Sequence, residues 1–258
     1  MSDLTYFFSD VHFQTSDSFG QQAFLNCLNS LPEHTRRIYF IGDLFDFWIG
    51  HPQVPDAYRA LCERLEDFIE KGVEIHVLTG NHDPVPMTQL SQTGVFIHTK
   101  PQEITLDNLK IWIEHGDLID PASALRRLVC RLARRPVIHQ LCRLIPQRLA
   151  WKLADHYTSQ PHEYTMPLHH ELKTTWFKIK AEQGFDAAII GHYHRALNTR
   201  LKGNNQTHQL IGLGDWLAQL TYARYDGKLE LLRFDPIDMR SLVVVTGDHC
   251  PPTMPTSA

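Results

Sequence analysis

The stretch from Ile38 to Asp46 ends an apolar run with two carboxylates whose spacing could serve chemistry. Its sequence, IYFIGDLFD, reads as a buried strand followed by a glycine, with Asp43 at the tip of the strand and Asp46 three residues later. An ionised carboxylate at the end of a buried strand is costly unless it meets a cation, and a metal ion is the natural partner. Taken alone, the pattern also fits a turn residue or a helix cap.

The same construction recurs at four other places in the chain, where an apolar run leads into polar residues with ligand side chains. These side chains are oxygen and imidazole donors without a thiolate, a mixture that suits Mn, Fe or Zn in a two-metal hydrolytic centre. Ligands collect beyond the carboxyl ends of strands in an α/β layer, so we expect these residues to form one site. The candidate metal ligands are Asp10, His12, Asp43, Asn81, His115, His192 and His194.

Strands and helices alternate along the first 80 residues, which predicts an α/β layer architecture. Apolar residues at helical spacing predict helices near Gln21–Leu31 and Pro55–Lys71. Later segments read as short strands, with a hairpin from Glu103 to Glu114 that turns at Asp107-Asn108. We therefore expect two packed sheets flanked by helices. Further strands are predicted near Gln209–Leu213, Leu220–Tyr225 and Lys228–Phe234, with Asp226-Gly227 as a type I′ turn.

Composition describes an ordinary globular protein of 258 residues, 43% hydrophobic and 21% charged. No apolar run approaches the roughly 18 residues of a membrane span, and the chain enters a strand too early for a signal peptide. We therefore expect a cytoplasmic protein. Five cysteines without a C-x-x-C motif fit reduced thiols in that compartment.

The segment Pro121–Ala154 differs from the rest because it contains eight Arg or Lys residues and no Asp or Glu. Its charge is +8 in a chain of net charge −4, and such segregation indicates a partner. One interpretation is a solvated helical insertion whose leucines pack on the main domain. The other is a basic, apolar lid that takes an anionic lipid and rests on an anionic leaflet. The candidate contacts are Arg126, Arg127, Arg131, Arg134 and, after this segment, His162.

Nucleic acid is the weaker partner for this segment, since it has one aromatic residue, Trp151, and is rich in leucine rather than in stacking rings. We divide the chain accordingly. The expected core comprises residues 1–120 and 176–240, the helical, basic lid insertion spans residues 121–175, and a C-terminal tail spans residues 241–258.

The motifs D-x-H, G-D-x-x-D, G-N-H-D, H-G-D and G-H-x-H run in this order from Asp10 to His194 and resemble those of the calcineurin-like metallophosphoesterases. The resemblance implies a four-layer fold and two divalent metal ions, Mn²⁺ first, with Fe or Zn as alternatives. In the family pattern, one ion is held by Asp10, His12 and His194, the other by Asn81, His115 and His192, and Asp43 bridges both.

The resemblance also implies roles for residues beside the ligands. Two cations can lower the pKa of a shared water and hold a phosphate ester in line with it. His82 follows Asn81 directly, so we expect it over the substrate phosphate as a cationic stabiliser or general acid. With Asp43, it forms the expected catalytic pair. Asp46 or Asp83 could orient a histidine from behind the ligands.

A looser resemblance within the family is to the enzymes that split UDP-2,3-diacylglucosamine into UMP and 2,3-diacylglucosamine 1-phosphate, on the way to lipid A. It rests on G-D-L-F-D-F-W, on H-G-D and on the later L-G-D-W and F-D-P. The best-known of those enzymes has an arginine at the position of His82. The resemblance implies a lipid-linked nucleotide substrate and a peripheral location on the inner face of the cytoplasmic membrane. The alternatives are hydrolysis of soluble nucleotides, or a scaffold of the same fold without activity.

Overall fold

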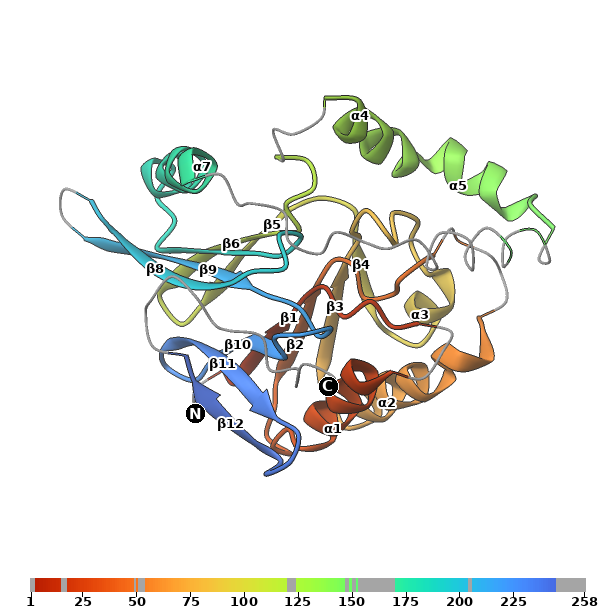
Figure 1. Ribbon diagram of the computed structural model, residues 1–258, viewed down its shortest axis with the longest axis horizontal. Coiled ribbons are helices and arrows are strands. Elements are labelled where there is room, and N and C mark those ends of the chain that lie inside the picture. The colour runs from red at the N-terminus through yellow and green to blue at the C-terminus, as the bar shows by residue number, and fades with distance from the viewer. Residues whose placement is uncertain are drawn as a thin grey trace, which may run out of the picture.

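The computed structural model describes residues 3–14, 18–48, 50, 54–119, 124–146, 149, 152, 170–203 and 206–244. Two mixed β-sheets pack face to face, with helices on both outer faces (Figure 1). The seven-stranded sheet has the order β12-β11-β10-β1-β2-β3-β4, and the five-stranded sheet has the order β5-β6-β7-β9-β8. This arrangement confirms the predicted four-layer α/β fold.

The strands are β1 Thr5–Phe8, β2 Arg37–Ile41, β3 Glu74–Leu78, β4 Phe96–His98, β5 Gln102–Leu106, β6 Leu109–Glu114, β7 Ala187–Ile190, β8 Ala196–Lys202, β9 Thr207–Leu213, β10 Thr221–Tyr225, β11 Leu229–Asp235 and β12 Arg240–Val243. The helices are α1 Phe19–Asn29, the 3₁₀ turn η1 Asp56–Tyr58, α2 Arg59–Glu70, α3 Thr88–Gln92, α4 Ala124–Ala133, α5 Pro136–Arg143 and α7 His170–Glu182. None of the helices in the described ranges combines the length and the apolar character that crossing a bilayer requires.

The space between the sheets is filled by apolar side chains from both, among them Phe7, Ile41, Ile113 and Ile189. These strands are buried on both faces, which is why they read as continuous apolar runs in the sequence. Strands β1, β2 and β3 are parallel neighbours, and so are β6 and β7. Their carboxyl ends therefore come out together at one edge of each sheet.

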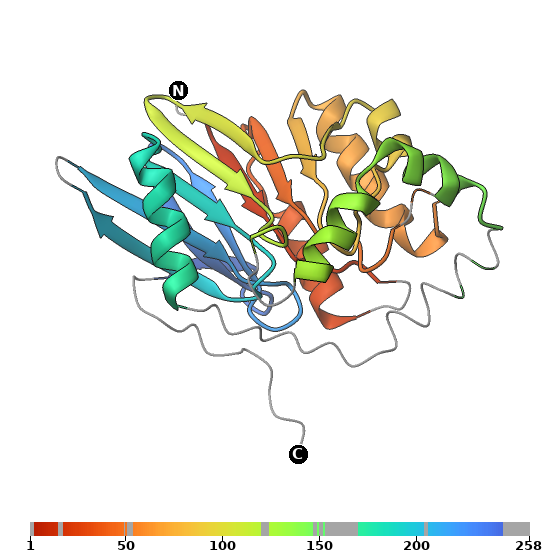
Figure 2. The same cartoon turned by 90° about the horizontal axis from the view of Figure 1, so that it is seen from above.

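Helices α1 and α2 cover the outer face of the seven-stranded sheet, as predicted to within a few residues (Figure 2). Helix α1 is capped by Ser18, whose side chain accepts a hydrogen bond from the Gln21 backbone N–H, and the helix buries Phe24 and Leu28. Helix α2 buries Leu61, Leu65 and Phe68 at helical spacing.

One detail of the predicted strands was wrong. The β5–β6 hairpin turns at Asp107 as expected, but the loop after β10 is not a type I′ turn. Tyr225 pairs with Leu229, which leaves three residues in the loop, and Gly227 has a positive φ whereas Asp226 does not. Strand β12 also includes the first three residues of the segment assigned to the tail, because it pairs with β11. Residues 245–258 lie outside the described ranges.

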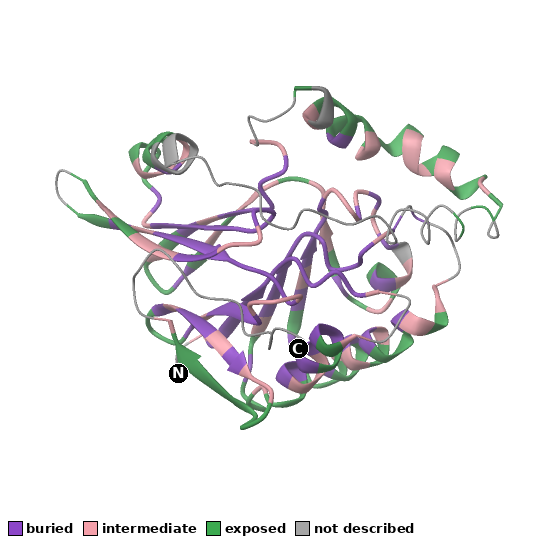
Figure 3. Cartoon of the chain, viewed as in Figure 1, coloured by how far each residue is buried: buried purple, intermediate pink, exposed green. Residues whose placement is uncertain are grey.

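Helices α4 and α5 lie along one side of the molecule, outside the packed layers (Figures 1 and 2). Pro136 occupies the first turn of α5, where its missing N–H is not needed. Cys130 is buried and Cys142 packs against the main core, whereas most of the apolar side chains on these helices are exposed (Figure 3). The later part of the expected lid insertion, residues 147–169, lies largely outside the described residues.

Candidate metal centre

All seven candidate ligands meet at one edge of the sheets. Each follows a strand that ends just before it, namely β1, β2, β3, β6 or β7. Asp10, His12 and His194 form one group. His12 Nε2 lies 3.3 Å from His194 Nε2, which in turn lies 3.5 Å from an oxygen of Asp10. These side chains therefore lie close together, as the strand ends predicted, and His12 also forms a group of possible ligands with Asp46 and His82.

The second group adjoins the first through Asp43. Asp43 Oδ2 lies 3.2 Å from His115 Nε2 and 3.9 Å from His12 Nε2, so this carboxylate faces both groups. Asn81 Oδ1 lies 3.2 Å from the same nitrogen of His115. The ligand atoms of Asp43, His115 and His192 all lie within 4.8 Å of one another, as do those of Asp10, His12 and His194.

The backbone at the site is held in a conformation that most residues avoid. Asp10, His12, Asp43, His192 and His194 have φ values of 52°, 49°, 52°, 68° and 47°, in the left-handed region. Such residues cost free energy locally and cluster at functional sites, where the surrounding structure imposes them. The backbone thus aims these side chains at a common point at the expense of local strain.

Two glycines allow the ligand loops to approach each other closely. A Cβ atom at Gly80 would lie 2.0 Å from an oxygen of the Asp43 carboxylate, and one at Gly191 would lie 2.6 Å from an oxygen of Asp10. Neither distance is possible for a real side chain. The glycines in the G-N-H-D and G-H-x-H motifs therefore make room for the carboxylates of other loops.

Asp46 and Asp83 stabilise the site in different ways. Asp46 Oδ1 lies 3.0 Å from Nδ1 of His12 and 3.6 Å from Nδ1 of His82, so it orients histidines as expected. Asp83 does not contact a histidine ring in the described structure. Its carboxylate accepts hydrogen bonds from the backbone N–H groups of Gly80, Asp43 and Leu44, at 2.7, 3.2 and 2.8 Å, and so holds two ligand loops together.

His82 is fixed from two sides beside the candidate ligands. Its backbone N–H donates to Asp43 Oδ1 at 2.8 Å, and its ring Nδ1 lies 2.9 Å from the backbone oxygen of Asp46. Because that oxygen can only accept, Nδ1 carries the proton of this bond. The ring stands edge-on to the ring of His12, with 4.5 Å between the centroids.

Negative charge dominates the electrostatics of this cluster. Burial lowers the pKa of His82 and of His115, but the nearby carboxylates together outweigh burial: Asp43 and Asp46 raise the pKa of His82 to about 9, and Asp43, Asp10 and Asp117 raise that of His115 to about 10. Burial opposes ionisation of Asp43, yet His115 and His82 hold the pKa of this carboxyl well below its usual range. A potential that draws protons onto imidazoles also attracts divalent cations. The donor set and its field therefore fit a metal centre.

Sequence reasoning assigned no role to Asp215, which stands behind His194. Asp215 Oδ2 lies 3.5 Å from His194 Nδ1, and Oδ1 accepts hydrogen bonds from the backbone N–H groups of Leu217, Ala218 and Gln219. The available signal was the L-G-D-W motif after β9, which presents a buried carboxylate at a strand end as the other motifs do.

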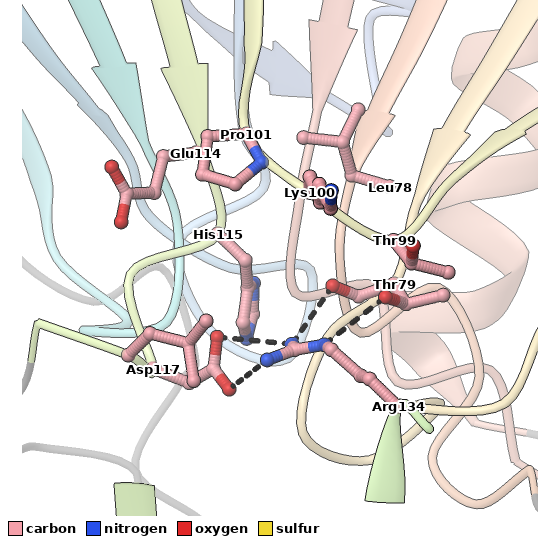
Figure 4. Close-up of a pocket in the computed structure, with 10 residues that line it drawn as sticks. Leu78, Thr79, Thr99, Lys100, Pro101, Glu114, His115, Asp117 and Arg134 are labelled. Carbon is pink, nitrogen blue, oxygen red and sulfur yellow. Dashed lines mark hydrogen bonds and ion pairs between the residues drawn. The ribbon is translucent and has the colours of Figure 1, made fainter. Parts of the chain in front are cut away.

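The arginines predicted to contact substrate do not behave alike. Arg131 is exposed and Arg127 partly so, but the Arg134 side chain is only 7% exposed and contacts Asp117 and Thr79 at the sheet edge where the candidate ligands meet (Figure 4). Arg134 therefore lies against the loops of the candidate ligands, whereas Arg131 faces solvent. The side chain of Arg126 and all of His162 lie outside the described structure.

The comparisons with known proteins agree with this geometry. The family model for calcineurin-like phosphoesterases matches residues 4–196. The chain is 27% identical over 213 residues to UDP-2,3-diacylglucosamine hydrolase of Pseudomonas entomophila, covering 81% of this chain and 89% of that protein. It is 27% identical over 237 residues to the protein of the same name from Coxiella burnetii, covering 89% and 97%.

Among solved structures, the chain is similar to zinc-complexed Vps29 from Entamoeba histolytica, with a TM-score of 0.46 and 14% identity over 93% of this chain and 97% of that one. The family model, by contrast, spans every motif from Asp10 to His194, and its residues meet in one buried, negatively charged cluster. The chain therefore belongs to the calcineurin-like phosphoesterase family and is a metal-dependent hydrolase.

Proposed function

We propose that this protein hydrolyses the pyrophosphate bond of UDP-2,3-diacylglucosamine to give UMP and 2,3-diacylglucosamine 1-phosphate, a step towards lipid A. The observation that carries the proposal is the similarity to hydrolases named for this substrate over 81% to 89% of the chain. That similarity extends beyond the metal motifs, which end at His194, and so includes segments that a generic phosphoesterase would not need to share.

The proposed metal ligands are the seven residues that meet at the sheet edges, with Asp43 shared between two ions. Mn²⁺ is the first candidate for both ions, and Fe or Zn are the alternatives, because the donors are carboxylate, amide and imidazole groups without a thiolate. When bound, the ions would supply Lewis acidity for the attack of water on phosphorus. Asp46 and Asp83 keep the ligand side chains and loops in register for this role.

His82 is proposed to act on the substrate rather than on the metals. Its Nδ1–H is committed to the backbone oxygen of Asp46, which sets the orientation of the ring. The other ring nitrogen, Nε2, is then the atom that can donate a proton to the leaving phosphate oxygen. The carboxylates of Asp43 and Asp46 favour the protonated ring that this role requires.

Helices α4 and α5 are proposed to receive the acyl chains and to rest on the anionic inner leaflet of the cytoplasmic membrane. Leu128, Val129 and Leu132 of α4 are 51%, 56% and 48% exposed, and Val137 and Leu141 of α5 are 60% and 54% exposed. This argues against leucines that merely pack on the main domain. Exposed apolar side chains beside arginines are typical of helices that lie in a lipid interface.

The test is a comparison of three substrates with the same metal-loaded protein. We expect rapid turnover of UDP-2,3-diacylglucosamine, little turnover of UDP-glucose, and slow turnover of a simple aryl phosphodiester. Equal or faster hydrolysis of UDP-glucose would favour a pyrophosphatase of soluble nucleotides instead. Failure to hydrolyse any of the three, with both metals bound, would favour a scaffold.

A further inference from the structure

One buried guanidinium joins the end of helix α4 to the sheet edge where the candidate metal ligands meet. Arg134, one residue beyond α4, forms a bidentate ion pair with Asp117, with Nη1 2.8 Å from Oδ2 and Nη2 3.0 Å from Oδ1. Its Nη2 also donates to the backbone oxygen of Thr79 at 3.0 Å, and its Nε donates to the Thr79 hydroxyl at 3.2 Å. All three guanidinium nitrogens are thus bound to two short stretches of the core (Figure 4).

Those two stretches are the loops that carry two of the proposed metal ligands. Thr79 directly follows β3 and precedes Asn81 by two residues, whereas Asp117 follows His115 by two residues after β6. Within each pair the intervening residue is a glycine, so the ligand and the partner of Arg134 are joined by very short chains. A shift of the guanidinium would therefore displace Asn81 and His115 directly.

The burial of the pair separates it from an ordinary surface contact. The side chains of Arg134 and Asp117 are 7% and 3% exposed, whereas Arg131 and Arg135 on either side are exposed. A planar guanidinium fixes a carboxylate by two parallel hydrogen bonds, which sets orientation as well as distance. Arg134 therefore fixes the positions of Thr79 and Asp117 relative to each other, a role for which its exposed neighbours are not placed.

We propose that Arg134 is a positioning residue that couples the seating of helix α4 to the metal site of Asn81 and His115. The inference rests on the proposed assignment of these two residues as ligands. Metal binding at Asn81 and His115 then depends on the position of α4. Asp10, His12 and His194, by contrast, do not contact Arg134 in the described structure. A substrate that draws α4 into place would thereby also order the ligand loops.

The test measures metal binding directly and needs no substrate. Removing Arg134 alone leaves the Asp117 charge buried without its partner, which can unfold the region. The informative variant is therefore the neutral pair Arg134→Gln/Asp117→Asn, examined beside Arg134→Lys, with melting temperature and circular dichroism as checks of folding. Calorimetric titration of the metal-free protein with Mn²⁺ gives the affinity of each binding step.

We expect the neutral pair to weaken one of the two Mn²⁺ binding steps at least tenfold and the other less than threefold. The electron paramagnetic resonance spectrum is recorded at a free Mn²⁺ concentration below the dissociation constant of the weakened site. Under this condition the signal of a spin-coupled Mn²⁺ pair should give way to that of a single ion. Arg134→Lys should lie between this variant and the parent, because an ammonium cannot make the bidentate contact. The matched control, Arg131→Gln, changes an exposed arginine one turn away and should leave both steps within twofold.

Equal weakening of both steps in a folded variant would overturn the proposal, since it would make Arg134 a support for the whole core. No change in either step would do so as well, as would the same loss in Arg131→Gln. These outcomes are independent of the substrate proposal. A protein that binds Mn²⁺ as expected but does not hydrolyse UDP-2,3-diacylglucosamine would refute the proposed function and leave the role of Arg134 intact.

Discussion

The ligand loops and helices α4 and α5 are built on opposite principles. At the ligand loops, polar side chains are buried, five of them on backbone with positive φ, and each loop is bound to a neighbour by hydrogen bonds. On α4 and α5, apolar side chains are exposed, and the ties to the core are few, with Arg134 the most extensive of those described. Both the buried polar side chains of the loops and the exposed apolar side chains of the helices are the reverse of what the hydrophobic effect alone would favour.

This difference separates the two tasks of the proposed enzyme. Chemistry at phosphorus needs charged groups held within fractions of an ångström, so that strain and burial are tolerated there. Recognition of flexible acyl chains needs apolar surface and little fixed geometry, so exposure is tolerated on the helices. Substitutions in the first region should therefore affect every substrate, and substitutions in the second should affect the lipid substrate alone.

The largest effect is expected at the residue that faces both ligand groups. Asp43→Asn should lower metal occupancy and reduce turnover of every substrate to background, because a neutral amide cannot bridge two divalent cations. Metal analysis and assays with the lipid and aryl substrates check this. Asp56→Asn, which changes an exposed carboxylate, is the control and should retain both metals and activity. Two bound ions in Asp43→Asn, together with more than a tenth of parental activity, would contradict the bridging role.

The next effect is expected at His82, which is proposed to act on the substrate rather than to bind a metal ion. His82→Ala should keep both metals, while kcat falls by roughly 10² to 10⁴, the range for a general acid or base. The fall should be similar for the lipid and the aryl phosphodiester. His34→Ala, at an exposed histidine, should change neither quantity. Loss of metal together with activity would instead make His82 a ligand or a structural support.

A smaller and selective effect is expected when the charge of α4 and α5 is reversed. Arg134 is excluded because it is buried against Asp117, so the change is Arg131, Arg135 and Arg143→Glu, which lowers the segment charge from +8 to +2. At about 1 kcal/mol per basic residue near an anionic surface, vesicle binding should fall strongly, most visibly at low salt. Hydrolysis of UDP-2,3-diacylglucosamine should fall more than tenfold, and that of the aryl phosphodiester less than threefold.

The matched control for this charge reversal is Lys71, Lys178 and Lys202→Glu, which makes the same change in net charge at exposed positions elsewhere. It should leave vesicle binding and lipid turnover near the parental values. If both triple variants lose lipid turnover equally, overall charge matters and the position of the arginines does not.

The smallest effect compares one leucine from each kind of environment. Leu132→Ala should change the free energy of unfolding by less than about 0.5 kcal/mol, because the side chain is 48% exposed, but should raise KM for the lipid roughly threefold or more. Leu65→Ala, in the buried face of α2, should cost about 2–5 kcal/mol and leave KM unchanged in the folded protein. Urea denaturation and steady-state kinetics measure both quantities. A large loss of stability in Leu132→Ala would show that α4 packs more tightly than its exposure indicates.

The strand ends could be predicted from sequence because the same local signal, an apolar run followed by ligand residues, occurs five times, four of them with an adjacent glycine. Strand burial and the parallel order then bring these residues together, so Asp10 and His194 could be placed in one site although they are 184 positions apart in the chain. The two long helices before β3 followed from apolar spacing for the same reason. In each case the signal lies in residues that are close in the sequence, and the fold then brings the signalled residues together.

What could not be predicted depends on contacts between residues that carry no shared pattern. Arg134 is one of eight basic residues in its segment, and only the approach of the helix to Thr79 and Asp117 distinguishes it. Asp215 gains its role from the 3.5 Å approach to His194. The exposure of Leu132 likewise depends on the side of α4 that faces the core, which helical spacing alone does not give.

Gly80 and Gly191 have a consequence for how members of this family are sorted by sequence. A single methyl group at either glycine would occupy the space of a ligand carboxylate, although no ligand would have changed. A chain could therefore keep every donor and still lose the reaction. An inventory of ligands is thus insufficient to separate enzymes from inactive relatives, and these two small residues belong in the diagnostic pattern beside the donors.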